Sequence, residues 1–241
     1  LARACSLLEE SITLCRQIHN IRILVEALFW HGYVTFEERD YEQARSSTEE
    51  CLVLARETGN INILAAGTFT LGKIAFDQGD YAQAQFLYEK SLKLYQEVEV
   101  MVGIPRVLSR LAEVLHAQGS DERARTCYEK SLKIFQECGD ESDAAWSLQG
   151  LGETALHQQR WHEAHTYFVE SLGMFRKQGN TRSIARGLMG LAGVAEGQKQ
   201  PERAARLLGA TATLLEITGD SHWKSPIFRT EYERIIAAVR S

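Results

Sequence analysis

The sequence predicts an all-α fold, a solenoid built of antiparallel helix pairs. Three observations predict it: residue types recur every 40 positions, apolar residues within each copy follow a helical spacing, and the 241 residues contain only three prolines. A period of 20 to 50 residues is typical of solenoids, in which each unit packs against its neighbours. Proline interrupts helices, so its scarcity favours long uninterrupted ones. No segment shows the strict alternation of apolar and polar residues that marks a half-buried strand.

The 40-residue period is clearest at one small position. The residues that share it are Ala4, Ala44, Ala84, Ala124, Ala164 and Ala204. An apolar side chain follows ten positions later in each copy, at Leu14, Leu54, Leu94, Ile134, Met174 and Leu214. Four copies close on Gly-Asn or Gly-Asp, at 59–60, 139–140, 179–180 and 219–220. Glycine adopts the left-handed backbone conformation that ends many helices, so these pairs indicate helix ends.

Two breaks divide each copy into two helices. We expect the first helices of the pairs near residues 22–38, 61–78, 103–118, 142–158 and 181–198, and the second helices near 2–18, 41–58, 81–98, 121–138, 161–178 and 201–218. The chain then forms one domain, 1–241, with a half repeat over 1–20 and repeats over about 21–60, 61–100, 101–140, 141–180 and 181–220. A last helix after Pro226, over 226–240, caps the array, because a terminal repeat otherwise exposes an apolar face.

A recurring motif points to a repeat family. The spacing from Leu71-Gly72 to Ala84 and Tyr88 returns from Leu111-Ala112 to Ala124 and Tyr128, and from Leu151-Gly152 to Ala164 and Phe168. It resembles the tetratricopeptide repeat, extended from the usual 34 residues to 40. The resemblance implies a right-handed superhelix whose first helices line a concave groove. HEAT and armadillo repeats also have periods near 40 residues, but the ladder of small residues favours the tetratricopeptide repeat.

The end of the chain carries a second resemblance. Residues 201–210, with Tyr232-Glu233-Arg234, resemble the closing segment of the repeat arrays in bacterial STAND-class signal-transduction ATPases and large LuxR-type regulators. The resemblance implies that the repeats sense a ligand or partner and that an upstream domain binds nucleotide. The chain has no G-x-x-x-x-G-K-[ST] loop, and Leu1 aligns with Tyr41, half-way through a repeat. We therefore expect a longer protein with a covalently linked nucleotide-binding domain upstream.

Composition excludes several classes of partner. The 27 basic and 32 acidic residues are interspersed and leave a net charge of −5, which disfavours nucleic acid. No apolar run approaches the roughly 20 residues that span a bilayer, so we expect no membrane contact. The five cysteines contain no C-x-x-C, which argues against a disulfide framework or a zinc knuckle. These features predict a cytoplasmic protein.

Counting along the first helices assigns side chains to the concave groove. The expected groove residues are Phe29, Tyr33, Phe36, Phe69, Lys73, Phe76, Arg106, Glu113, Trp146, Gln149, Glu153 and Arg186. The early repeats supply aromatic rings and the later ones mostly charges. Aromatic rings bury a large area at little entropic cost, which suits a peptide or amphipathic helix with an apolar anchor. The alternative is that some of these side chains are core residues between adjacent first helices.

A stripe of glycines follows one face of the last first helix. Its members are Gly187, Gly190, Gly193 and Gly197. Each interior glycine costs about 0.5–1 kcal/mol relative to alanine, so the stripe needs a reason. We expect it to allow tight packing of the C-terminal helix, with close approach of a ligand as the alternative.

The candidate catalytic and metal-binding residues are few. His157, His162 and His165 lie close in sequence, but neither a cysteine nor a carboxylate completes an obvious zinc set, so we predict no metal and no cofactor. His31 occupies a leucine position of the repeat, which suggests a core or groove-edge residue. Three serines recur with the period, at Ser91, Ser131 and Ser171. A residue repeated in every copy serves the repeat, so we predict no enzyme activity.

Together these features predict a non-enzymatic sensor module of a larger bacterial signalling protein. It binds a peptide, a protein segment or a small ligand in its concave groove. One alternative is a scaffold that mediates protein contacts or self-assembly without a ligand. The other is a small-molecule sensor whose aromatic rings stack on an oligosaccharide.

The period also predicts how the helices of a pair meet, with the small residue at the Gly72 position facing the alanine at the Ala84 position. We expect Ala124→Leu to overpack this contact and to lower the free energy of unfolding by about 1–3 kcal/mol. Lys130→Ala lies on the other side of the same helix and should cost less than about 0.5 kcal/mol. Thermal denaturation measures both, and equal melting temperatures would contradict the predicted register.

Overall fold

The chain folds into consecutive helices. The computed structural model describes residues 2–98, 102–218 and 233–237, and within these ranges there is no strand. Eleven helices are formed by the described residues: α1 (Ala2–Gln17), α2 (Ile21–Glu37), α3 (Tyr41–Glu57), α4 (Ile61–Asp77), α5 (Tyr81–Glu97), α6 (Gly103–Ala117), α7 (Asp121–Glu137), α8 (Glu141–His157), α9 (Trp161–Lys177), α10 (Thr181–Gly197) and α11 (Pro201–Thr218). Each bound lies within one residue of the expected helix, so the all-α prediction is confirmed.

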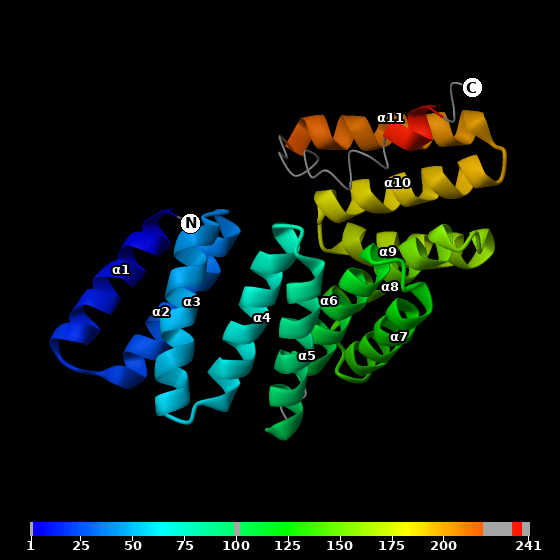
Figure 1. Cartoon of the computed structure of the whole chain (residues 1–241). Coiled ribbons are helices and arrows are strands. Elements are labelled where there is room, and N and C mark those ends of the chain that lie inside the picture. Colours follow the sequence, from blue (N-terminus) through cyan, green and yellow to red (C-terminus); the bar gives the residue numbers. More distant parts are fainter. Residues whose placement is uncertain (1, 99–101, 219–232, 238–241) are drawn as a thin grey trace. The chain divides into compact units, whose positions relative to one another are not determined.

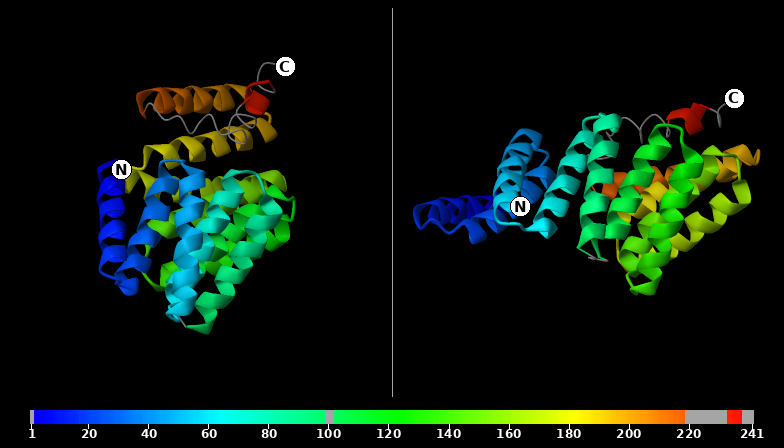
Figure 2. Two further views of the ribbon diagram at one scale, coloured as in Figure 1. Left: turned by 60° about the vertical axis from the view of Figure 1, so that its left-hand side comes forward. Right: turned by 60° about the horizontal axis from the view of Figure 1, so that its bottom comes forward.

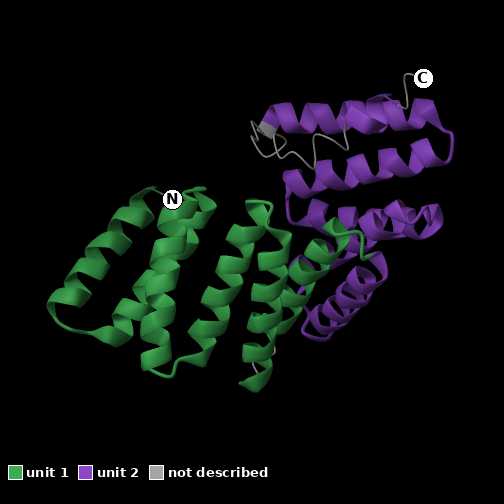
Figure 3. Ribbon diagram, in the orientation of Figure 1, with its two compact units in different colours: residues 1–120 green, residues 121–241 purple. Residues whose placement is uncertain are grey.

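The helices form two compact units, residues 1–120 and 121–241 (Figure 3). In the first unit α1 to α6 follow one another as antiparallel neighbours, and α4 also packs against both α2 and α6 (Figures 1 and 2). In the second unit the same pattern runs from α7 to α11, with α8 beside α10. First helices of successive repeats thus lie next to each other within each unit. The expected limits of the repeats and of a single domain stay a prediction.

The turns between helices repeat one backbone geometry every 20 residues. Glycine takes a positive φ in five of them, at Gly59, Gly79, Gly119, Gly139 and Gly179. The equivalent residues His19, Arg39, Gln159 and Lys199 adopt φ between 55° and 65° without being glycine. The next residue caps the following helix: Asn20, Asp40, Asn60, Asp80, Asp140 and Asn180 each accept a hydrogen bond from the backbone N–H three residues on. The predicted glycine helix ends are confirmed within the described residues.

The core of each unit is organised by aromatic rings that lie against glycines. The Phe168 ring on α9 is fully buried, and a Cβ added to Gly152 of α8 or Gly190 of α10 would lie 2.8 or 2.3 Å from it. In the first unit a Cβ on Gly72 would lie 2.5 Å from the Tyr88 ring. The nearest atoms to Gly72 thus belong to the Tyr88 ring, one helical turn beyond Ala84, while at the equivalent Gly32 the carbonyl of Ala44 lies 3.2 Å from the added Cβ.

The alanine ladder lies beneath these rings. Five of the six alanines, Ala44, Ala84, Ala124, Ala164 and Ala204, are completely buried, whereas Ala4 on α1 is exposed. Their small size lets the second helix approach its neighbours closely. Lys130, on the opposite side of α7 from Ala124, is exposed, as the register predicted from the sequence requires.

The glycine stripe of α10 serves packing, but mostly against α9. Cβ atoms on Gly187, Gly190 and Gly197 would lie 2.9 Å or less from side chains of α9, those of Leu172, Phe168 and Trp161. Gly193 alone of the four faces the C-terminal segment, with Ile235 Cδ1 at 3.6 Å and Leu156 Cδ2 at 3.0 Å. Packing was thus the correct interpretation, whereas the expected partner was only partly right.

Part of the expected capping helix, 226–240, lies outside the described residues. Residues 233–237 are helical. Within them Ile235 is completely buried in a cluster with Met189, Ala192 and Leu208. This segment covers apolar side chains of α10 and α11, which is what a cap does.

The ring-on-glycine contact predicts opposite effects for two glycine substitutions. Gly190→Ala places a methyl group against the buried Phe168 ring, so we expect the free energy of unfolding to fall by about 1–3 kcal/mol. Gly173→Ala, on the exposed side of α9 with no atom within 4 Å of the added Cβ, should raise it by about 0.5–1 kcal/mol. Urea denaturation measures both, and stabilisation by both variants would contradict the packing described.

Candidate functional site

Three aromatic side chains cluster on α2 in the first unit, and we call them the α2 aromatic patch: Phe29, which is partly buried against the core, and the exposed Trp30 and Tyr33. The Trp30 ring lies 5.2 Å from Phe29 and 6.0 Å from Tyr33, centroid to centroid, and both pairs meet edge to face. Trp30 is 54% exposed and Tyr33 is 38% exposed. Exposed aromatic side chains in one cluster are typical of protein interaction sites.

Trp30 was not among the expected groove residues. A signal for it exists in the sequence, because the other repeats place Thr70, Arg110, Gly150 and Gly190 at the same position of the period. A large aromatic side chain where the repeats otherwise vary among small and polar residues serves this repeat alone. The prediction from the sequence omitted Trp30 because it selected fixed positions of the period and did not look for residues that differ from their counterparts in the other repeats.

Lys73 connects the patch to the next first helix. Its Nζ donates to Glu37 Oε1 at 3.2 Å and lies 4.0 Å from the centre of the Phe36 ring and 5.0 Å from that of Tyr33. Burial lowers the pKa of Lys73, and the neighbouring Glu37 carboxylate opposes that effect. Burial raises the pKa of Tyr33, and the Glu37 carboxylate adds to that rise. The Lys73 ammonium group is thus held at the edge of the aromatic surface by two rings and by the Glu37 carboxylate.

Three further aromatic residues of the expected groove hold helices together. The Phe36 ring is 6.0 Å from Tyr41, the Phe76 ring 5.4 Å from Tyr81, and the Phe69 ring 5.5 Å from Tyr88. Phe36 is buried and the other two are partly buried. Each ring joins a first helix to the second helix that follows it. The structure therefore gives these three a packing contact at the junction of a pair, whereas the alternative had expected core residues between adjacent first helices.

Arg106 and Glu113 of the expected groove lie on α6. Arg106 is exposed, whereas Glu113 is partly buried and accepts a hydrogen bond from Arg110 Nη1 at 2.7 Å. The guanidinium groups of Arg106 and Arg110 both lie near enough to Tyr33 to oppose the rise of its pKa. The charged side chains of α6 thus belong to the surroundings of the α2 aromatic patch.

In the second unit the expected groove residues meet between α8 and α10. Arg186 forms two hydrogen bonds of 2.6 Å with the carboxylate of Glu153, and both side chains are partly buried. Such bidentate pairs fix side chains in one geometry. Trp146 packs edge to face on Phe175 of α9 at 5.3 Å.

Gln149 lies deeper than a groove residue. It is 1% exposed, and its Nε2 donates only a long hydrogen bond, 3.5 Å, to the Ser183 carbonyl. Among the described residues neither Gln149 Oε1 nor Ser183 Oγ has a hydrogen-bond partner. A buried carbonyl without a partner costs about 1–3 kcal/mol. The period places Phe29, Phe69, Ser109 and Met189 at the same position, so the repeat itself does not require a glutamine there.

The histidines and serines follow the structural interpretation. His157 Nδ1 lies 2.5 Å from Asp121 Oδ2, and His165 Nε2 accepts from Arg203 Nη2 at 3.3 Å. His31 is buried, in agreement with a core position. The recurring serines, Ser91, Ser131 and Ser171, are completely buried, and each is hydrogen-bonded to a backbone carbonyl or another serine.

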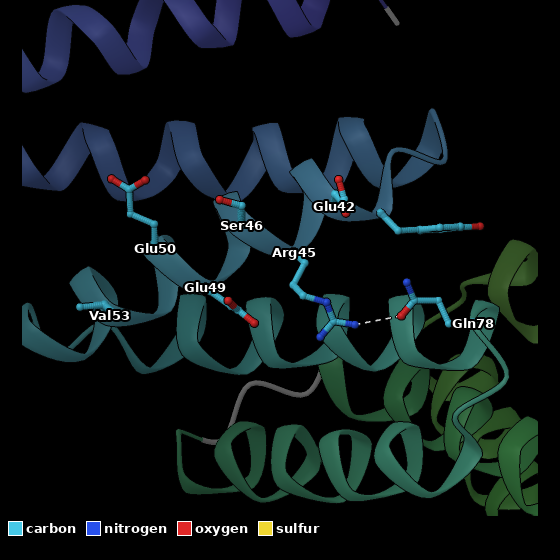
Figure 4. Close-up of a pocket in the computed structure, with 8 residues that line it drawn as sticks. Glu42, Arg45, Ser46, Glu49, Glu50, Val53 and Gln78 are labelled. Carbon is cyan, nitrogen blue, oxygen red and sulfur yellow. Dashed lines mark hydrogen bonds between the residues drawn. The ribbon is translucent and has the colours of Figure 1, made fainter.

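A hollow of about 740 Å³ lies along α3 (Figure 4). The residues that line it are Tyr41, Glu42, Arg45, Ser46, Glu49, Glu50, Val53 and Gln78. Arg45 Nη2 donates to Gln78 Oε1 at 2.9 Å, and Arg16 forms two short hydrogen bonds with Glu50. The hollow lies on a second helix and contains none of the expected groove residues.

Within the described ranges no helix combines the length and apolar character needed to cross a bilayer.

Comparison with known proteins identifies the family. A model of the tetratricopeptide repeat matches residues 23–97 and 103–177. The chain belongs to the tetratricopeptide repeat family. No curated protein sequence matches it.

Solved structures support the repeat fold at low sequence identity. BtubC (BKLC) from P. vanneervenii is similar with a TM-score of 0.75 and 19% identity, over 92% of this chain and 93% of that one. A Signal Transduction ATPase with Numerous Domains with a tetratricopeptide repeat sensor, from Pyrococcus horikoshii, gives 0.71 and 15%, over 95% of this chain but 36% of that one. The Rap conjugation gene regulator of plasmid pLS20, in complex with the Phr* peptide, gives 0.70 and 14%, over 87% and 58%.

The unpaired carbonyl of Gln149 predicts a stabilising substitution. Gln149→Met keeps the volume, follows the residue that the period has at 189, and removes a buried polar group, so we expect the free energy of unfolding to rise by about 1 kcal/mol. The matched control is Gln136→Met on the exposed side of α7, which should change it by less than about 0.5 kcal/mol. A fall in the melting temperature for Gln149→Met would contradict this account.

Proposed function

We propose that this chain is a non-enzymatic module that binds a peptide or a protein segment along its first helices. The observation that carries the proposal is the α2 aromatic patch, where Trp30 and Tyr33 are exposed although both rings are large and apolar. Burying them against a partner gains more than burying polar side chains of the same size. Tryptophan and tyrosine also dominate the binding energy of many protein interfaces.

The charges beside the patch suit an extended or helical peptide. Lys73 and Glu37 form a pair at its edge, with Lys73 fixed over the rings. Because Lys73 is already paired with Glu37 and its side chain is mostly buried, the pair adds a polar edge without a free charge. We assign to this patch the role of an apolar anchor site with an adjoining polar edge.

The second unit offers polar groups of a different kind. The Glu153–Arg186 pair joins α8 to α10, and Trp146 lies on the same first helix as Glu153. Glu153 and Arg186 are partly buried at this surface, whereas Gln149, one turn from Glu153, is 1% exposed. Charged side chains on first helices are suited to hydrogen bonds with a peptide backbone. In this proposal the two units supply separate binding elements.

Relatives of the fold are consistent with this function. The Rap conjugation gene regulator was solved with a peptide, and the archaeal STAND protein carries its tetratricopeptide repeats as a sensor. By analogy we propose that this chain is the cytoplasmic sensor of a larger bacterial signalling protein, with a covalently linked nucleotide-binding domain upstream. The expected groove residues on both units, from Phe29 to Arg186, remain part of this proposal.

Two other functions compete with this one. A ligand-independent scaffold would assemble through its ends or its second helices, where Phe86 on α5 is 60% exposed. An oligosaccharide sensor would stack sugar rings on the α2 aromatic patch between Glu37 and Arg106. The scaffold would use Phe86 and the oligosaccharide sensor would use Trp30 and Tyr33, so substitutions of these side chains separate the two alternatives.

The test uses a phage-displayed peptide library selected on the full chain, followed by affinity measurement of the selected peptides. We expect the double variant Trp30→Ala/Tyr33→Ala to bind them about 30-fold more weakly, which corresponds to about 2 kcal/mol of lost anchor energy. Phe86→Ala removes an equally exposed ring from a second helix and should leave the affinity unchanged. Light scattering should give the same mass for all variants.

Three outcomes would contradict the proposal. Equal loss of affinity in Phe86→Ala would place binding elsewhere. A mass that falls in Phe86→Ala, with no peptide selected, would favour the scaffold. Selection of glycans from an array, dependent on Trp30 and Tyr33, would favour the oligosaccharide sensor.

A further inference from the structure

The first copy of the period departs from the others at three positions that meet in space. His31 on α2 stands where the other repeats have Leu71, Leu111, Leu151 and Leu191. Ser47 on α3 stands where the other copies have Leu87, Cys127, Tyr167 and Leu207, and Cys5 on α1 stands where they have Arg45, Gln85, Arg125, His165 and Ala205. A leucine of the repeat has thus been replaced by an imidazole, which meets a thiol that no other copy has at that position. A shared replacement needs a reason other than the repeat.

The side chains of these positions, with Glu9, form one cluster. Cys5 and Glu9 lie one helical turn apart on α1 and face α2. His31 Nε2 is 3.7 Å from Cys5 Sγ and 3.8 Å from Glu9 Oε1, and all three donor atoms lie within 4.8 Å of one another. Zinc binds thiolate at about 2.3 Å and imidazole or carboxylate at about 2.0–2.2 Å, so tetrahedral coordination separates its donors by about 3.3–3.6 Å. The two distances from His31 Nε2 are within a few tenths of an ångström of that spacing, and the third donor pair lies within 4.8 Å.

The imidazole is also oriented as a ligand. His31 is buried, and its Nδ1 lies 2.8 Å from the hydroxyl of Ser47, which is buried as well. An Nδ1–H that donates to Ser47 leaves the lone pair of Nε2 pointing at Cys5 and Glu9. Metal-bound histidines are held in this way by an outer partner that fixes the tautomer and the ring. Ser47 is thus a positioning residue and not a ligand.

We infer that Cys5, Glu9 and His31 form a binding site for a zinc ion, with water as the fourth ligand. The donor set of one thiolate, one imidazole and one carboxylate is suited to zinc and poorly suited to magnesium or calcium, which prefer oxygen donors alone. The Cys5 thiol releases its proton when the ion binds. Because two ligands come from α1 and one from α2, the ion fastens α1 to the first complete helix pair. This site is independent of the proposed peptide-binding function.

The experiment uses the full chain without a histidine tag, reduced and stripped of metal by a chelator. Calorimetric titration with zinc chloride should give one ion per chain, and zinc should raise the melting temperature. Cobalt should produce a thiolate-to-metal charge-transfer band. We expect Cys5→Ser and His31→Leu each to weaken zinc binding by 100-fold or more and to abolish the rise in melting temperature. His31→Leu restores the residue of the repeat, and Cys5→Ser changes a partly exposed side chain, so both should fold.

Matched controls and the outer partner complete the test. Cys138→Ser and His162→Gln change exposed residues outside the cluster and should bind zinc as the unchanged chain does. Ser47→Ala should weaken binding about 10- to 100-fold, and Ser47→Thr should restore it. Absence of stoichiometric zinc binding would overturn the inference, and so would zinc binding that persists in both Cys5→Ser and His31→Leu. Unchanged affinity in Ser47→Ala would overturn the role assigned to Ser47.

Discussion

The contact of one buried aromatic ring with glycine on its neighbouring helices sets the spacing within each unit. Phe168 lies between Gly152 and Gly190, and Tyr88 lies against Gly72. A methyl group in either gap would overlap the ring, so the helix axes are fixed by the absence of side chains and not by a specific bond. The completely buried alanine ladder works in the same direction. A solenoid is a row of nearest-neighbour interfaces, so one local contact that recurs in successive copies is sufficient to build it.

This frame leaves the inward faces of the first helices free to vary. On α2 the variation gives exposed aromatic rings beside the Lys73–Glu37 pair, and between α8 and α10 it gives the Glu153–Arg186 pair next to the unpaired carbonyl of Gln149. Phe36, Phe69 and Phe76 face the same way in sequence but are used to join the two helices of a pair. Residues that hold the helices together mostly repeat with the period, and in our proposal the exposed departures from it are the ones that bind a partner.

Departures from the period also cost stability, and their positions are informative for that reason. A buried glutamine with an unpaired oxygen, or a buried histidine where the repeat has leucine, replaces apolar packing by polar groups that must be satisfied. At His31 the replacement is compensated by Ser47 and by the thiol and carboxylate of α1. At Gln149 the described residues offer only one long hydrogen bond.

The sequence by itself determined the helices, their pairing and their turns, since hydrophobic spacing, capping residues and left-handed glycines act within a few residues of each other and are read directly from the 40-residue period. It also located the first-helix positions from which groove residues were drawn. Only the tertiary structure decided which of them are exposed. Gly72 lies against the Tyr88 ring, Phe36 is buried while Trp30 is exposed, and Cys5 reaches His31 across 26 residues. The physical reason is that the period fixes the direction of a side chain around its own helix, whereas burial and contact depend on the size of the side chains opposite, which belong to other helices.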